Sequence, residues 1–262
     1  MTQNEEHPLA QQLVEKVWQE DGIVWLWLNR PTTRNALNDQ LVKELIDNLT
    51  ELAVDMQSRV LVISGRGGSF CSGGDVAALE NLQHQSPINR MESYRTMQRL
   101  ILALIQHPLP VIAAVDGPAV GAGCDLALAA DVVFASPNAT FGETFVQAGL
   151  VPDFGGSYLL PQIVGWHRAL DMLLTGQRID AQTAQNIGIV REVTPDLPAS
   201  VQQWAEQICR RSRETVKYLK AMAWHNRLPS LVEELSRASM MQSLMMDTEG
   251  HRAFVRNFLG KG

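Results

Sequence analysis

Residues 111–156 decide the fold, and they read VIAAVDGPAVGAGCDLALAADVVFASPNATFGETFVQAGLVPDFGG. A β-branched apolar run at 111–115 meets a glycine turn, which a small-residue segment at 124–130 follows at once. A second apolar run occupies 132–135. This order predicts a strand, a tight turn, a short buried helix and a second strand.

Two carboxylates stand at informative places in this stretch. Asp125 lies in the first turn of the expected helix, and Asp153 lies in a Pro-Asp loop just before two glycines. The first amides of a helix have no partner inside it and carry partial positive charge. Because residues 121–123 have almost no side chain, a ligand oxygen gaining negative charge could approach the amide of Ala122. The alternative is that these glycines only allow close helix packing.

Composition limits the class of protein. Of the 262 residues, 45% are apolar and 19% are charged, and the net charge is −6. This balance argues against a nucleic-acid partner. The first twelve residues are polar and acidic, and no apolar run is long enough for a membrane helix. Three distant cysteines, Cys71, Cys124 and Cys209, show no metal-ligand spacing, so we expect buried thiols, no metal and a cytoplasmic location.

Hydrophobic periodicity predicts alternating strands and helices up to about residue 198, followed by helices alone. We therefore expect a loose tail at 1–12, an α/β core at 13–198 and a helical region at 199–262. Segment 83–90 is polar and contains a proline, so it is expected to be a mobile surface segment of the lid type. Further expected elements are strands at 14–20, 23–28, 60–64 and 189–193, and helices at 39–56, 76–82, 92–106, 168–174, 181–187, 199–211 and 214–225.

Several motifs recur in one order along the chain, and together they are specific although each alone is weak. In that order and spacing they resemble the crotonase superfamily of acyl-CoA enzymes, over roughly residues 14–262. They are Asn29-Arg30-Pro31, Asn35-Ala36-Leu37, Phe70-Cys71-Ser72-Gly73-Gly74-Asp75, residues 113–131, Phe141-Gly142, residues 149–156 and Leu174-Thr175-Gly176.

The resemblance implies a crotonase-like spiral of ββα turns with a C-terminal helical trimerisation region, assembled as a homotrimer or a dimer of trimers. It implies an acyl-CoA thioester substrate, with coenzyme A as part of that substrate and no permanently bound cofactor. The amides of Gly74 and Ala122 would donate hydrogen bonds to the thioester oxygen and stabilise an enolate. For Arg34 and Lys261, a solvated side chain is the alternative to a CoA contact. The residues implied in CoA binding are Arg30, Arg34, Ser72, Gly74, Asp75, Val76, Ala122, Phe254 and Lys261.

The residues beside the substrate's second and third carbons distinguish reactions within the superfamily. Its hydratases use two glutamates, whereas this chain has Asp125 at the first position and Phe145 at the second. Isomerases that resemble the phenylacetate-pathway enzyme carry a catalytic aspartate where Asp153 stands. One carboxylate can move a proton from carbon 2 to carbon 4, and an apolar Phe145 would exclude water. Glu143 remains a candidate, expected on a strand with its side chain on the same face as Phe145.

Other functions stay open at this point. The chain could be an enoyl-CoA hydratase, or a hydrolase or dehalogenase in which Asp153 is the nucleophile. The related dehalogenases have a tryptophan near the position of Phe145, so this chain departs from them. A non-catalytic acyl-CoA-binding or RNA-associated family member is an alternative of another class. For Asp153 the plain alternative is a turn aspartate bonded to its own backbone, and for Asp125 a helix-end aspartate favoured by the dipole.

Overall fold

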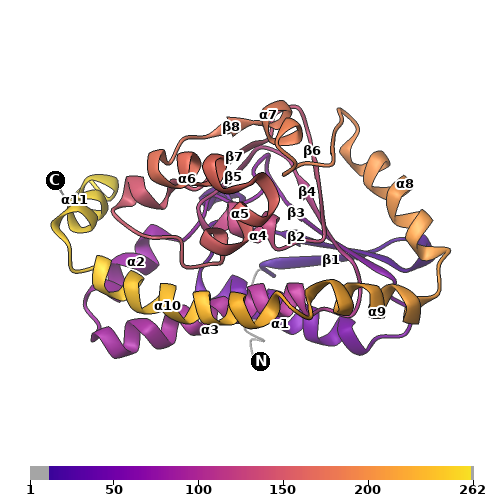
Figure 1. Cartoon of the computed structure of the whole chain (residues 1–262), viewed down its shortest axis with the longest axis horizontal. Helices are drawn as coiled ribbons and strands as arrows, with labels where there is room; N and C mark the ends of the chain where they lie inside the picture. Colours follow the sequence, from indigo (N-terminus) through magenta and orange to yellow (C-terminus); the bar gives the residue numbers. More distant parts are fainter. Residues whose placement is uncertain (1–11, 261–262) are drawn as a thin grey trace, which may run out of the picture.

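The computed structural model describes residues 12–260 and contains two sheets (Figure 1). The larger sheet has the strand order β1-β2-β3-β4-β6-β9, in which β1 and β2 are antiparallel and all other neighbours are parallel. The smaller sheet has the order β5-β7-β8. The strands are β1 Val14–Trp18, β2 Ile23–Leu28, β3 Val60–Gly65, β4 Val111–Val115, β5 Pro118–Val120, β6 Val132–Ala135, β7 Thr140–Gly142, β8 Ile179–Asp180 and β9 Glu192–Val193.

Helices cover both faces of the larger sheet. Its two faces separate because successive side chains of a strand point in opposite directions. Val24 and Leu26 of β2 face the main core, while Ile23 and Trp25 face a smaller core beneath α8. The helices are α1 Asp39–Val54, α2 Val76–Gln83, α3 Pro87–Ile105, α4 Ala122–Leu128, α5 Gly156–Val164, α6 Trp166–Thr175, α7 Ala181–Asn186, α8 Leu197–Cys209, α9 Arg213–Trp224, α10 Leu228–Met245 and α11 Glu249–Phe258.

The expected α/β order is confirmed, including the helices at the C-terminal end. The hairpin around Asp21 is present as β1 and β2, joined by a 3-10 turn in which Asp21 has a φ of 61°. Asn38 caps α1 through its side chain, which accepts from the amide of Leu41 at 2.9 Å. The division of the chain at residue 198 stays a prediction, and the expected tail lies largely outside the described residues.

Residues 84–89 are exposed, as expected of a surface segment, but helices occupy most of 83–90, and the mobility of the segment stays a prediction. Helix α2 runs to Gln83 and α3 already begins at Pro87, with Ser86 as its N-cap. Proline suits the first helical turn because its missing N–H would have no partner there. Arg90 is buried and donates to the carbonyl of Ser243 at 2.8 Å, so this part of α3 is attached to α10. The turn between α2 and α3 is therefore short and anchored.

The expected strand at 189–193 is shorter in the structure. Only Glu192 and Val193 pair with β6. The amides of Ile189 and Val190 instead donate to the carbonyl of Ala184, and these two hydrogen bonds form the turn that follows α7. Apolar letters alone could not separate this helix-ending turn from a strand, because both place aliphatic side chains in the core.

The C-terminal helices lie across the rest of the molecule. In Figure 1, α10 runs beside α3 along the lower edge, and α11 lies at the far end near α2. Gln98 of α3 joins α10 by donating to the carbonyl of Leu235 at 2.9 Å. Within residues 12–260, none of the helices combines the length and apolar character required to cross a bilayer.

Candidate active site

Two glycine-rich loops that are distant in sequence meet at the N-terminal end of α4. Cys71 forms an isolated parallel β-bridge with Ala119. The Cys71 amide donates to the carbonyl of Pro118 at 3.0 Å, and the Val120 amide donates to the carbonyl of Cys71 at 3.1 Å. A Cβ placed on Gly73 would lie 3.6 Å from the amide nitrogen of Ala122. The expected approach of the 73–74 turn to Ala122 is thus present in the structure.

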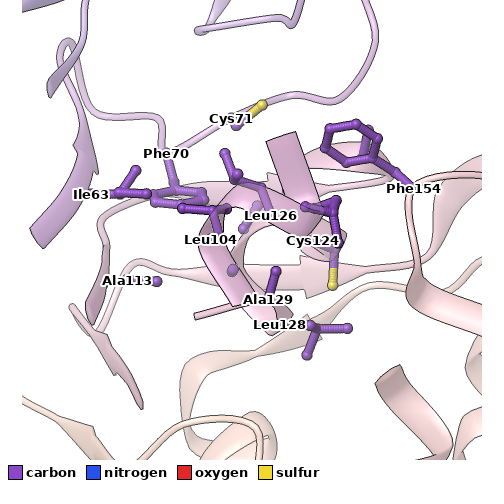
Figure 2. Close-up of a cluster of buried hydrophobic side chains, with 14 of the residues drawn as sticks. Ile63, Phe70, Cys71, Leu104, Ala113, Cys124, Leu126, Leu128, Ala129 and Phe154 are labelled. Atoms are coloured by element: carbon purple, nitrogen blue, oxygen red, sulfur yellow. The ribbon is translucent and has the colours of Figure 1, made fainter. Parts of the chain in front are cut away.

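The two loops can approach each other closely because glycines at the contact have no side chain. A Cβ on Gly123 would lie 2.2 Å from the carbonyl oxygen of Cys71, a distance that no side chain tolerates. Gly121 caps α4 with a φ of 54° and a ψ of −129°, a conformation that suits glycine. Figure 2 shows Cys71 above α4 and the side chains of Cys124 and Leu126 on the helix. All seven residues of α4 are buried.

The backbone donors expected from the sequence fall on these two loops. Ala122 is the first residue of α4, so its amide lacks an acceptor within the helix. Gly74 adjoins Gly73 and forms a bridge with Leu37, and a Cβ added to it would meet nothing closer than 3.9 Å. A side chain at Gly74 would thus be in ordinary van der Waals contact with Leu79, and small residues surround Ala122.

Asp153 is buried in the loop that precedes α5, and its side chain is not turned out to solvent. The residue is only 7% exposed. Its backbone carbonyl accepts a hydrogen bond from Gln98 at 2.7 Å, which fixes the loop against α3. Burial, and then the charge of Asp125, raises the pKa of Asp153 from 3.8 to about 8. A carboxyl with this proton affinity can accept and return a proton near neutral pH.

Asp125 and Glu143 form a second acidic cluster next to this loop. Both residues are fully buried, and burial raises the pKa of each; the charge of Glu143 adds to the rise at Asp125. The amide of Gly121, which caps α4, donates to the carbonyl of Gly142 at 2.8 Å. This hydrogen bond places Glu143, the next residue, beside the beginning of α4.

The expected strand geometry at Glu143 is wrong. Strand β7 ends at Gly142, and Glu143 is the N-cap of a 3-10 helix at Thr144–Ala148. Because the chain leaves the extended conformation there, strand alternation does not relate Glu143 to Phe145. Phe145 is nonetheless buried, as is Phe154, and both belong to the main hydrophobic core. Figure 2 shows Phe154 beside α4.

Arg30 and Asp75 interact with each other. The Arg30 guanidinium donates to Asp75 at 2.9 Å and also to the carbonyl of Ala36. Asp75 in turn caps α2 by accepting from the amide of Ala77 at 3.0 Å. These contacts connect the loop around residue 30 to the glycine-rich loop, and they leave Arg30 with internal partners for its charge.

The other residues expected to contact CoA are distributed around α2. Arg34 is exposed in a left-handed turn, and its carbonyl accepts from the amide of Ser72 at 3.0 Å. Val76 is the first residue of α2. Phe254 is partly buried on α11 and stacks on Phe258, with ring centroids 6.0 Å apart. Lys261 lies outside the described residues.

Asn35 is a buried residue whose function the sequence did not reveal. Its side chain accepts from the amide of Arg30 at 2.8 Å and donates to the carbonyls of Arg66 and Ser69 at 3.0 and 2.7 Å. It therefore holds the glycine-rich loop to the loop that follows β2. The sequence signal was its place in the motif Asn35-Ala36-Leu37, and in the structure it adopts a φ of 57°.

Comparisons with known proteins identify the family. A family profile described as Enoyl-CoA hydratase/isomerase matches residues 19–262. A crystal structure of an enoyl-CoA hydratase/isomerase from Mycobacterium paratuberculosis superimposes with a TM-score of 0.87 at 30% identity, and the match covers 94% of this chain and 98% of that one. The fold is that of the crotonase superfamily, and the chain belongs to the enoyl-CoA hydratase/isomerase family.

Curated relatives cover nearly the whole chain but differ in their reactions. A probable enoyl-CoA hydratase from Rhodobacter capsulatus is 35% identical, with 92% of this chain and 93% of the relative aligned. A 1,2-epoxyphenylacetyl-CoA isomerase from Escherichia coli is 32% identical, with 92% of this chain and 94% of the relative aligned. Membership of the family therefore does not fix which reaction this chain performs.

Proposed function

We propose that this protein is an enoyl-CoA isomerase that shifts the double bond of a 3-enoyl-CoA thioester to the 2 position, with Asp153 as the proton shuttle. The observation that carries the proposal is Asp153 itself, buried at 7% exposure with a pKa raised to about 8. A carboxyl of this kind is matched to proton transfer near neutral pH. Phe145 stands where a hydratase would have its second glutamate.

The first step removes a proton from carbon 2 and leaves an enolate. Its negative oxygen would accept hydrogen bonds from the amides of Gly74 and Ala122, which lie on the two converging loops. A preorganised donor of this type can lower a barrier by about 3 kcal/mol. The protonated Asp153 then delivers the proton to carbon 4, so that the carboxylate is regenerated and no water is consumed.

The apolar surroundings support a reaction without water. Phe145 and Phe154 are both buried, and Phe154 directly follows Asp153 in the chain, so these rings would help to exclude a nucleophilic water. The aspartate would also be more basic there than in solvent.

We further propose that coenzyme A lies across the surface around α2. The exposed Arg34 turn, Ser72, Val76 and the aromatic Phe254 of α11 would contact it. Arg30 and Asp75 would support this surface through their ion pair, in addition to any direct contact with CoA. A homotrimer or a dimer of trimers, as proposed from the resemblance, is compatible with exposed apolar side chains such as Trp166 and Leu174.

Hydration of 2-enoyl-CoA is the second candidate reaction. The name of the Rhodobacter capsulatus relative favours it, and Asp125 and Glu143 supply a pair of carboxyl groups. Both of these groups are fully buried, however, whereas a hydratase needs carboxylates that reach a water at carbon 3. A hydrolase or dehalogenase with Asp153 as nucleophile would instead leave a covalent adduct on that residue, which mass spectrometry detects.

The decisive experiment compares 2-enoyl and 3-enoyl thioesters as substrates of the wild type and of Asp153→Asn. We expect the wild type to convert the 3-enoyl substrate to a product of unchanged mass. The variant is expected to lose at least about 100-fold in kcat, because general acid–base groups contribute that much.

The control for this comparison is folding. The variant should keep the wild-type far-ultraviolet circular dichroism spectrum, since an amide has the shape of the carboxyl group that it replaces. Near-normal isomerisation by the folded variant would refute Asp153 as the shuttle. A product heavier by one water would show that hydration is the main reaction.

A further inference from the structure

Asp125 and Glu143 come from separate segments and meet over the first residue of α5. A Cβ placed on Gly156 would lie 2.1 Å from Asp125 Oδ1 and 2.8 Å from Glu143 Oε2. Both carboxyl groups therefore reach into the same small volume, which the absent side chain of Gly156 leaves free. Both residues are 0% exposed, so neither carboxyl group is in contact with bulk solvent.

The four carboxyl oxygens lack hydrogen-bond donors among the described residues. The amides of Phe154 and Gly156 are near enough to favour the charged form of Asp125, but no donor meets hydrogen-bond geometry with either side chain. Leaving buried acceptors without donors costs about 1–3 kcal/mol each, and more when they are charged. Two neighbouring buried carboxylates also repel each other strongly, so both cannot be ionised.

A proton on either carboxyl group removes both penalties. It cancels one of the two charges, and it supplies the O–H donor that the other group lacks. We propose that Asp125 and Glu143 share one proton and act together as a single buried negative charge beside Asp153, which makes Glu143 a positioning residue of the reaction. The catalytic part of this inference rests on the proposed function, because it requires Asp153 to be the base.

Few other titratable groups face the pair. Asp153 approaches from the loop before α5, and the buried Cys124 thiol approaches from α4 itself. Within the described part of the chain, no cation contributes to the electrostatics of the pair. The charge of the pair is therefore not neutralised locally. The charge of Asp125 raises the pKa of Asp153 in addition to the effect of burial, and in the shared-proton pair that charge is held by both residues.

Amide substitutions test whether the two groups act as a unit. In Asp125→Asn or in Glu143→Gln, the new amide donates to the remaining carboxylate, so one negative charge persists. In the double variant Asp125→Asn/Glu143→Gln the charge is gone. For isomerisation of a 3-enoyl thioester, the acid-side midpoint of the kcat/KM profile should stay near that of the wild type in both single variants. It should fall by about one pH unit in the double variant.

The midpoint is the readout here because Asp125 can also affect the rate directly. A midpoint in the double variant equal to that of the wild type would overturn the inference. So would a single variant that shifts as far as the double variant, because one residue would then carry the charge alone.

Infrared spectroscopy tests the shared proton without catalysis. In the Asp153→Asn background at pH 7, the pair should give the carbonyl stretch of one buried protonated carboxyl group. Adding Asp125→Asn and Glu143→Gln together should abolish that band, which assigns it to the pair. Absence of the band in the first protein, or an intensity equal to two protonated carboxyl groups, would overturn the inference, with circular dichroism verifying the fold of each variant.

The two hypotheses fail in different ways. If the wild type does not isomerise a 3-enoyl thioester, the proposed function is wrong, while the infrared band still decides whether the proton is shared. If the wild type isomerises the substrate and Asp153→Asn does not, a missing band refutes the shared proton alone.

Discussion

At the scale of the residue, the burial of Asp153 that suits its carboxyl group to proton transfer also lowers the stability of the folded protein as the pH rises. Its pKa is raised from 3.8 to about 8, because burial and the charge of Asp125 disfavour the carboxylate. Between these two pH values the folded protein retains a proton that the unfolded chain releases. Raising the pH through this window therefore favours unfolding.

This linkage predicts how Asp153→Asn changes stability. Wild-type stability should fall as the pH rises from about 4 to 8, and the variant should lose less over the same range. At pH 8 the variant should be more stable by a few kcal/mol, since each tenfold change in proton affinity corresponds to about 1.4 kcal/mol. Urea unfolding at several pH values measures this difference. Parallel stability curves for the two proteins would contradict a raised pKa at Asp153.

The sequence predicted which acidic residues lie buried near α4 and α5 better than it predicted how they are arranged. Asp125 and Asp153 were identified from a glycine turn and a Pro-Asp loop, and both are buried near α4 and α5 as expected. Glu143 was misplaced because one residue decides whether β7 continues, and period-2 reasoning fails beyond the strand end. Contacts between distant segments, such as those of Asn35, leave no periodic signal in the sequence.

At the scale of the element, α4 depends on a glycine that no other residue can replace without moving the backbone. A Cβ on Gly123 would lie 2.2 Å from the carbonyl oxygen of Cys71 and 2.8 Å from its Cβ. Either α4 or the 71–74 loop must move to accommodate it. The approach of the 73–74 turn to Ala122 would then be altered.

We therefore predict that Gly123→Ala lowers stability by roughly 2–4 kcal/mol and reduces kcat more than it changes KM. Gly250→Ala is the matched control, because Gly250 is an exposed residue of α11 with nothing within 4 Å of an added Cβ. The control should be neutral or slightly stabilising. Thermal unfolding and steady-state kinetics provide the measurements. A Gly123→Ala protein as stable and active as the control would contradict the packing described for α4.

Helix boundaries show the same division between what was and was not predictable. Periodicity and the Asn38 cap predicted α1 closely, because a long amphipathic pattern carries many consistent positions. The polar letters at 83–90 suggested a mobile segment, yet a serine cap and a proline at the first turn begin α3 there. Arg90 is buried by a contact with α10, which lies about 150 residues later in the chain and could not be read locally.

At the scale of the whole molecule, the C-terminal helices enclose the loop that carries Asp153. Gln98 of α3 donates both to the carbonyl of Asp153 and to the carbonyl of Leu235 in α10. Tyr94, one turn earlier on α3, donates to Met246 just beyond the end of α10. The backbone of Asp153 is therefore attached to α3, which lies beside α10 (Figure 1). This enclosure is what the proposed reaction requires, because a proton held by a shielded group exchanges slowly with water.

The most direct measurement follows a labelled proton through the reaction. A 3-enoyl-CoA carrying deuterium at carbon 2 is incubated with the enzyme in ordinary water, and the product is analysed by mass spectrometry with positional assignment. Our account predicts a 2-enoyl product with no added water and with deuterium from carbon 2 retained at carbon 4 in a measurable fraction of molecules. A product without deuterium at carbon 4, or one heavier by a molecule of water, would contradict a single shielded carboxyl group as the proton shuttle.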